Sequence, residues 1–282
     1  MSQDPRTKLS KSFVEKLNDD LVGLSRNCSC LIKDMASKRF AKDLKSDQSF
    51  VTEVDFAVED LIREFVQKKY PDHGVKGEER EDMLPGSEFQ WITDPVDGTQ
   101  NLVHGIPTFG SVIGVHYCGY PLAGAIEHPL LDLSYSGAFG LGSFLNGKRL
   151  KIDDVGDCPI NTLDRQEILA MSTRDCFKRC GEENLFDQLM RDHPSTRVYY
   201  DIFSTTRAVE GQIGAVVEFG MKIWDIAATE ILVTEAGGDY KVLRRVCKGG
   251  TKKDLISIVA GKPKVVNFLY DYLGGYKESL NG

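Results

Sequence analysis

Hydrophobic residues recur every three to four positions along two stretches near the start of the chain, residues 11–40 and 54–66. This spacing gathers them on one side of a helix, so both stretches predict amphipathic helices. The second helix opens with Thr52-x-x-Asp55, which is close to a capping box, and it ends before Pro71. We therefore expect two helices before the first strand.

The pattern then changes to short apolar runs separated by glycine and proline. The run "FQWIT" predicts a strand that stops at Asp94–Pro95, and residues 110–152 predict a meander of several strands. Beyond residue 155 we expect strands at 167–173, 214–220 and 255–261, and helices near 182–192, 203–213, 225–236 and 264–275. This alternation predicts an α/β layered protein, a single domain with lobes at roughly 1–155 and 156–282.

The composition is that of an ordinary globular protein, with 282 residues, 41% hydrophobic and 27% charged. The formal net charge of −7 argues against nucleic acid as a partner. The hydrophobic runs fall short of the roughly 20 residues of a membrane helix, so we expect no membrane association. Seven cysteines, an odd number in a chain without a secretory signal, favour reduced thiols and a cytoplasmic protein.

The stretch "ITDPVDGTQNL" carries the strongest chemical signal, because Asp94 and Asp97 are only three positions apart. Pro95 turns the backbone, so both carboxylates and the Val96 carbonyl can converge on one point. Several hard oxygen ligands suit Mg²⁺. The backbone amides of the following Gly98-Thr99 can bind an anion. A turn rich in Asp, Pro and Gly with no bound ion is the alternative interpretation.

Other acidic residues each have an ordinary structural explanation as well. Glu78 begins a charged segment that could simply lie in solvent, and Asp55 could serve only as the capping partner of Thr52. Asp225 is expected at the start of a helix, where a negative charge stabilises by about 0.3–1 kcal/mol. These residues become functional candidates only when they are considered together.

Four segments, in this order, resemble the inositol monophosphatase superfamily: "VTEVD", "GEE", "DPVDGTQNL" and "WDIAATEILVTEAGG". The family-like "GSFLNGKRL" lies between the third and the fourth. The resemblance implies a layered α-β-α-β-α sandwich of two lobes, a homodimer, and a lithium-sensitive, Mg²⁺-dependent phosphatase. It also implies two or three Mg²⁺ ions per active site.

The same resemblance implies a role for each matching residue. The first Mg²⁺ would bind Glu78, Asp94 and the Val96 carbonyl, and the second would bind Asp94, Asp97 and Asp225. Asp55 and Thr99, together with Glu78, would activate the attacking water. The Gly98 and Thr99 amides would hold the phosphate, and the substrate would also contact Asp97, Asp201, Glu218 and Asp225.

The substrate expected from this resemblance is a small phosphorylated polyol or amino alcohol. The Glu218 to Asp225 spacing resembles inositol monophosphatases, and we rank inositol phosphate first. Asp201 resembles histidinol-phosphate phosphatases, which are the alternative, and a carboxylate there would favour an amine. Asp201 could equally be a helix cap. A bisphosphate nucleotidase and a catalytically inactive metal-binding relative are less favoured.

The sequence does not place a catalytic cysteine or serine beside a convincing base. Uncatalysed hydrolysis of phosphate monoesters is extremely slow, and two metal ions can activate water and neutralise the phosphate. We therefore expect direct in-line attack by water on the phosphate.

Overall fold

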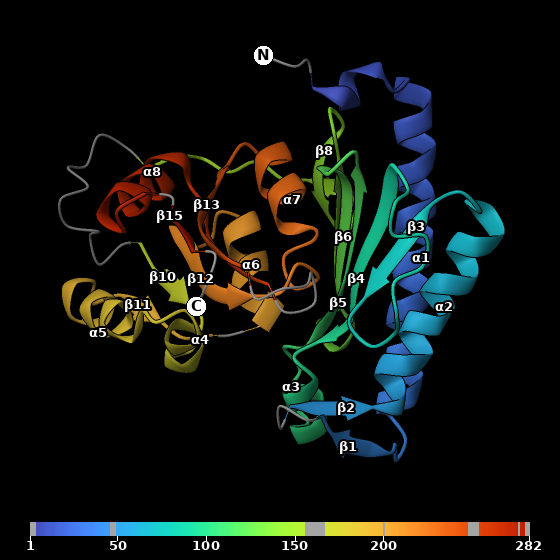
Figure 1. The fold of residues 1–282 in the computed structure, drawn as a ribbon, viewed down its shortest axis with the longest axis horizontal. Coiled ribbons are helices and arrows are strands. Elements are labelled where there is room, and N and C mark those ends of the chain that lie inside the picture. The colour runs from blue at the N-terminus through green and yellow to red at the C-terminus, as the bar shows by residue number, and fades with distance from the viewer. Residues whose placement is uncertain are drawn as a thin grey trace.

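The computed structural model describes residues 4–45, 49–155, 167–199, 201–247, 254–275 and 277–279. Helices and sheets alternate in five layers (Figure 1). The helices are α1 (Lys11–Ala36) and α2 (Glu53–Lys69) outside the first sheet, α6 (Asp201–Val209) and α7 (Thr229–Glu235) between the sheets, and α8 (Pro263–Tyr272) outside the second. The expected α-β-α-β-α sandwich is confirmed.

The first sheet has the strand order β3-β4-β5-β6-β7-β8-β9. Its strands are β3 (Gly74–Gly77), β4 (Phe89–Asp97), β5 (Gly110–Tyr117), β6 (Tyr120–His128), β7 (Leu133–Ala138), β8 (Gly142–Leu145) and β9 (Lys148–Arg149). β3 and β4 pair in parallel, and each later strand pairs antiparallel with its predecessor. The predicted meander is therefore confirmed.

The second sheet has the order β11-β10-β12-β14-β13-β15 and mixes parallel with antiparallel pairs. Its strands are β10 (Leu169–Met171), β11 (Thr196–Arg197), β12 (Ala215–Met221), β13 (Asp239–Val246), β14 (Leu255–Gly261) and β15 (Lys277–Ser279). Helices α4 (Arg174–Arg179) and α5 (Glu183–Asp192) join β10 to β11. The core strands β12 and β14 are the predicted apolar runs 214–220 and 255–261.

Smaller elements complete the described chain. They are the 3₁₀ helices Pro5–Lys8 and Pro129–Leu131, the hairpin of β1 (Lys42–Leu44) and β2 (Phe50–Thr52), and the short helix α3 (Thr99–His104). The hairpin lies next to α3 at one end of the first sheet (Figure 1). In the sequence it separates α1 from α2, so the expectation of two helices before the first strand is wrong. The predicted lobe boundary near residue 155 falls beside residues 156–166, which are outside the described part, and stays a prediction.

Four predicted boundaries are wrong, and one of them is the end of α6, which lies at Val209 rather than near residue 213. α1 ends at Ala36, four residues earlier than expected. β4 does not stop at Asp94–Pro95 but continues to Asp97, because the strand absorbs the proline in a bulge where the register with β5 shifts. The helix expected over 225–236 begins only at Thr229, after a turn that contains Asp225.

Some strands were not predicted, because they lack the short apolar runs that were used to identify strands. β13 reads "DYKVLRRV", and its charged and partly exposed residues hide its alternation. β3 contains two glycines, which disfavour strands. Within the described residues, every helix is too short or too polar to cross a membrane.

Candidate active site

The acidic site is built on the bulge of β4. Strand pairing with β5 is regular up to Asp94 and resumes at Asp97, so the two residues between them are displaced from the ladder. The Val96 amide donates to Asp94 Oδ1 at 3.0 Å, which closes a small turn around Pro95. Asp94 and Asp97 are 4% and 6% exposed. The bulge therefore buries two carboxylates on the same side of the strand.

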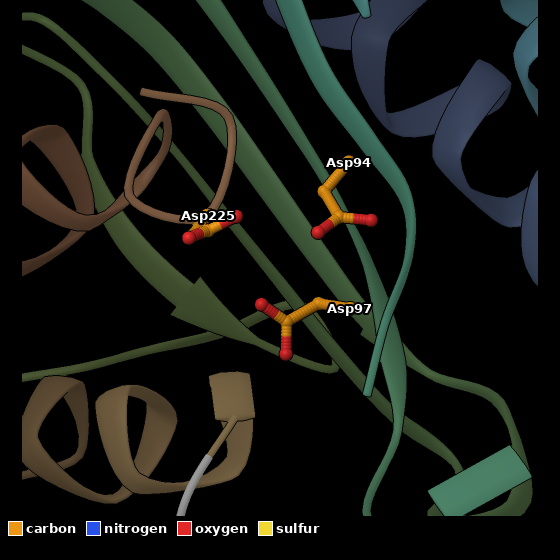
Figure 2. Close-up of side chains that lie close together, drawn as sticks. All are labelled: Asp94, Asp97 and Asp225. Atoms are coloured by element: carbon orange, nitrogen blue, oxygen red, sulfur yellow. The ribbon is translucent and has the colours of Figure 1, made fainter. Parts of the chain in front are cut away.

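The third carboxylate, that of Asp225, comes from the turn between β12 and α7. Its neighbours Trp224 and Ile226 are buried in the core, and the Lys222 amide donates to Asp225 Oδ2 at 2.7 Å. One oxygen from each of Asp94, Asp97 and Asp225 lies within 4.8 Å of the other two. Figure 2 shows the three side chains directed toward a common space. This spacing suits a cation bound between them.

Electrostatic repulsion at this place is strong. Burial and the charge of Glu78, followed by Asp97 and Asp225, raise the pKa of Asp94 well above its usual value. Burial and the charges of Asp201 and Asp225 do the same to the pKa of Asp97. The pKa of Asp225 rises to about 7, through burial and then Glu78. Clustered carboxylates of this kind are compensated by cations or by uptake of protons.

Glu78 lies beside these three residues but outside the tight cluster. Lys45, which follows β1, donates to Glu78 Oε1 at 2.7 Å and to Glu79 Oε1 at 2.6 Å. The two carboxylates raise the pKa of Lys45 against the opposing effect of burial. The structure thus brings the predicted Glu78 to the rim of the site and adds a lysine that the sequence analysis missed.

Asp55 makes the capping contact and also a second contact beside the acidic cluster. Its Oδ2 accepts from the Thr52 amide at 2.8 Å and the Thr52 hydroxyl at 2.6 Å, which confirms the capping box of α2. Its Oδ1 lies 3.0 Å from the Thr99 hydroxyl, which is also 2.9 Å from the Val96 carbonyl. One carboxylate therefore caps the start of α2 and orients the Thr99 hydroxyl beside the acidic cluster.

Gly98 joins the acidic strand to α3. Its φ of +83° is in the left-handed region, and a Cβ there would lie 2.9 Å from Asp201 Oδ2, so only glycine fits without displacement. α3 begins at Thr99. The first N–H groups of a helix have no acceptor within the helix, which leaves the Thr99 amide available to an anion.

Asp201 lies at the site and also begins α6. Its carboxylate accepts from Asn101 Nδ2 at 2.6 Å, and the next amide, that of Ile202, donates to Asp97 Oδ1 at 2.6 Å. Burial raises the pKa of Asp201 to about 7. Asp201 is thus the first residue of α6, and its carboxylate lies beside the Gly98 turn; a contact with substrate stays a prediction.

Glu218 is 2% exposed on β12, and its Oε2 has no hydrogen-bond partner among the described residues. Burial raises its pKa well above the usual value, and Asp201 and Asp225 add to this effect, so the three carboxylates are near one another. A buried oxygen without a partner is costly unless a ligand supplies a donor. Glu218 Oε2 is therefore a place where a ligand could supply a donor.

The sequence analysis missed two polar neighbours, Lys45 and Asn101. Asn101 belongs to the quoted stretch "DPVDGTQNL", but it was not given a role, since its partner Asp201 is 100 residues away. Lys45 lies in a polar segment without a hydrophobic pattern. Contacts of this range could not be found from local spacing.

Comparison with known proteins places this arrangement in a family. The sequence model of the inositol monophosphatase family matches residues 14–261. The chain is 32% identical over 248 residues to a fructose-1,6-bisphosphatase/inositol-1-monophosphatase of Aquifex aeolicus, covering 83% of this chain and 85% of the relative. It is 30% identical over 208 residues to a histidinol-phosphatase of Chlorobaculum parvum, covering 73% and 78%. An inositol monophosphatase structure from Anabaena superposes with a TM-score of 0.74 at 22% identity, covering 92% of this chain and 95% of that one.

Proposed function

The chain belongs to the inositol monophosphatase family and is a phosphoric monoester hydrolase, and we propose that it cleaves small phosphate monoesters with the help of two or three Mg²⁺ ions. The observation that supports this most directly is the cluster of the buried Asp94 and Asp97 with the partly exposed Asp225, in which one oxygen from each residue lies within 4.8 Å of the other two. Three clustered carboxylates with raised pKa values suit a hard divalent cation.

The residues that would hold the metal ions are those expected from the sequence: Glu78, Asp94, the Val96 carbonyl, Asp97 and Asp225. Bound Mg²⁺ would neutralise phosphate oxygens and lower the pKa of a water molecule. To bind a metal ion, the Glu78 carboxylate must either keep its contact with Lys45 while it coordinates the metal or break that contact. The donor set therefore fits the metal, with Glu78 as its most adjustable member.

The protein's own groups would orient the attacking water and receive its proton. The Thr99 hydroxyl can donate to Asp55 Oδ1 and accept from the water at the same time. Asp55 is fixed by Thr52 through its other oxygen, so the Thr99 hydroxyl is held in one direction. The amides of Gly98 and Thr99 would bind the phosphate. Thr99 and Asp55 thus act as a general-base pair.

For the leaving group, we propose an amino alcohol such as histidinol. Asp201 and Glu218 are two carboxylates beyond the metal cluster, the first partly buried and the second fully buried, and Glu218 Oε2 has no partner among the described residues. An ammonium group would satisfy both, since it is a compact cation with several donors. A neutral polyol could donate hydrogen bonds but would supply no cation, so with it these carboxylates would be compensated only by protons, as their raised pKa values allow.

Inositol phosphate, which the sequence analysis ranks first, becomes the second candidate. It is favoured by Glu218, because a single buried carboxylate oxygen can accept from a hydroxyl group as well as from an amine. The family match supports both substrates, since the similar proteins include an inositol-1-monophosphatase and a histidinol-phosphatase.

Phosphate release from four compounds tests the proposal. These are histidinol phosphate, inositol 1-phosphate, adenosine 3′,5′-bisphosphate and fructose 1,6-bisphosphate, each with Mg²⁺ and with EDTA. We expect Mg²⁺-dependent release, with the highest kcat/KM for histidinol phosphate. Undiminished activity after complete chelation would contradict the metal assignment. A higher kcat/KM for inositol 1-phosphate than for histidinol phosphate would make inositol phosphate the first candidate substrate.

Three further expectations are also proposals. Inhibition by millimolar Li⁺ and assembly as a homodimer rest on family membership, and a cytoplasmic location rests on the odd number of cysteines. Activity titrated with LiCl against a KCl control and light scattering of the purified protein test the first two. Fluorescence microscopy of a tagged chain in its native cell tests the third.

A further inference from the structure

Helix α2 carries a second buried carboxylate, Glu59, one turn after Asp55. Glu59 is fully buried, yet it does not belong to the acidic cluster. Residues four positions apart lie on the same face of a helix. The face of α2 that presents Asp55 to Thr99 therefore also presents Glu59.

Glu59 contacts the loop that follows β3, where Glu78 lies. Its Oε2 accepts from the Glu79 amide at 2.8 Å, and its Oε1 accepts from the Arg80 amide at 3.1 Å. Arg63, one turn further along α2, donates from Nε to Oε1 at 2.8 Å and orients the carboxylate. The two amides directly after Glu78 are thus fixed by a single carboxylate.

Gly77, directly before Glu78, fits this arrangement for a steric reason. A Cβ at this position would lie 2.2 Å from Glu59 Oε1 and 2.3 Å from its Cδ, too close for any real contact. The backbone on both sides of Glu78 is therefore packed against the same carboxylate. This explains why glycine precedes the two glutamates of "GEE".

We propose that Glu59 is a positioning residue for the metal ligand Glu78, and that α2 fixes the distance between this ligand and the water-activating pair. The inference rests on the proposed function, in which Glu78 binds Mg²⁺. Asp55 holds Thr99 at the start of α2, and Glu59 holds the Glu78 loop one turn later. Because both contacts come from one rigid helix, a shift in either would change the spacing of the whole site.

The simpler explanation is that Glu59 and Arg63 form a buried ion pair that serves only the stability of the fold. The two explanations predict different Mg²⁺ affinities for folded variants of Glu59. A purely structural pair would lower the melting temperature in EDTA when broken, and the folded protein would bind Mg²⁺ unchanged. A positioning residue would weaken Mg²⁺ binding in protein that is still folded.

The test compares Glu59→Gln with Glu64→Gln by calorimetric titration of the metal-free protein with Mg²⁺. Glu64 is an exposed residue of the same helix, so its substitution is a matched control. We expect Glu59→Gln to weaken Mg²⁺ binding about 10–100-fold, as is usual for groups that orient metal ligands, and Glu64→Gln to leave it unchanged. At saturating Mg²⁺, the KM of Glu59→Gln for substrate should stay near that of the wild type.

Two more variants keep the proposal testable if Glu59→Gln does not fold. Glu59→Asp retains the charge but shortens the reach to the two amides, and Gly77→Ala displaces the carboxylate from the other side. Both should weaken Mg²⁺ binding as well. Wild-type affinity in every folded variant would overturn the proposal.

Glu78→Gln separates this proposal from the proposed function. If Glu78→Gln binds Mg²⁺ like the wild type, the ligand assignment itself fails. If Glu78→Gln weakens binding and the Glu59 variants do not, the assignment holds and only the positioning role is wrong.

Discussion

The two sides of the site differ in how completely their polar groups are satisfied. Asp55, from the first part of the chain, has partners for both carboxylate oxygens, namely Thr52 and Thr99. Glu218, from the later part, is equally buried, but its Oε2 has no partner among the described residues. The oxygens of Asp55 are thus satisfied within the protein, whereas Glu218 Oε2 could still accept a hydrogen bond from a ligand.

This difference fits a division between reaction and recognition. Groups that orient water must be fixed before the substrate arrives, because preorganisation lowers the barrier. Groups that recognise the leaving group gain affinity when their polar atoms are satisfied only by the correct ligand. The comparison predicts that variants on the first side impair turnover of every substrate, while variants on the second side alter the preference between substrates.

The largest expected effect is that of Asp97→Asn. Asparagine keeps the volume and can still accept from the Ile202 amide, so the fold should persist. It removes one charged metal ligand, and we expect kcat/KM to fall about 10³-fold or more for all substrates, with weaker Mg²⁺ binding. Steady-state kinetics at several Mg²⁺ concentrations measure both effects.

Asp187→Asn is the control for this change, because Asp187 is in an exposed pair with Arg174, and such pairs contribute about 0–1 kcal/mol. It should leave activity unaltered. Normal turnover and a normal Mg²⁺ titration of Asp97→Asn would show that Asp97 is not a metal ligand.

The second effect in size is that of Thr99→Ala. Removing the hydroxyl that lies 3.0 Å from Asp55 should lower kcat about 10²–10⁴-fold, the usual contribution of general acid–base catalysis. Mg²⁺ affinity should change little, because this hydroxyl is not among the expected metal ligands. Thr99→Ser restores the hydroxyl and should recover most of kcat. If serine were as inactive as alanine, the loss would come from packing.

The third effect distinguishes the two sides most directly. Asp201→Asn removes a charge but keeps an oxygen for Asn101. If the substrate is an amine, losing its ionic partner costs roughly 2–5 kcal/mol in kcat/KM, while inositol 1-phosphate turnover should stay within about tenfold. The ratio of the two kcat/KM values, before and after substitution, is the measurement. An equal loss of kcat/KM for both substrates would show that Asp201 serves the reaction and does not set the preference between substrates.

The grouping of residues around the β4 bulge could be predicted from the sequence, and that around Glu218 only in part; their roles in the reaction stay predictions. Asp94, Asp97, Gly98 and Thr99 lie within six positions of one another, so proline and glycine chemistry indicates their convergence. Asp225 and Glu218 required the resemblance to a known family. The contacts of Asp201 with Asn101, and of Glu59 with the Glu79 amide, join distant segments through tertiary packing. Local spacing carries no information about such pairs.

The fold shows the same limit. Helices with strong periodicity, such as α2, and apolar strands, such as β12 and β14, were predicted well. The end of β4 was not, because a proline normally ends a strand, whereas here pairing with β5 on both sides of Pro95 stabilises a bulge. The misjudged residues are those that bring Asp94 and Asp97 together.

The smallest expected effect is a pH dependence of stability. Asp201 and Asp225 have pKa values raised to about 7, so between about pH 4 and 7 the folded protein binds more protons than the unfolded chain. In EDTA, the melting temperature should therefore fall as pH rises through this window. Mg²⁺ should reverse the trend, because it binds the ionised carboxylates of the folded state and its stabilisation grows with pH. Asp225→Asn removes one of the two groups, so thermal melts of this variant in EDTA should depend less steeply on pH than those of the wild type. Equal slopes in the two proteins would show that Asp225 ionises normally in the folded state.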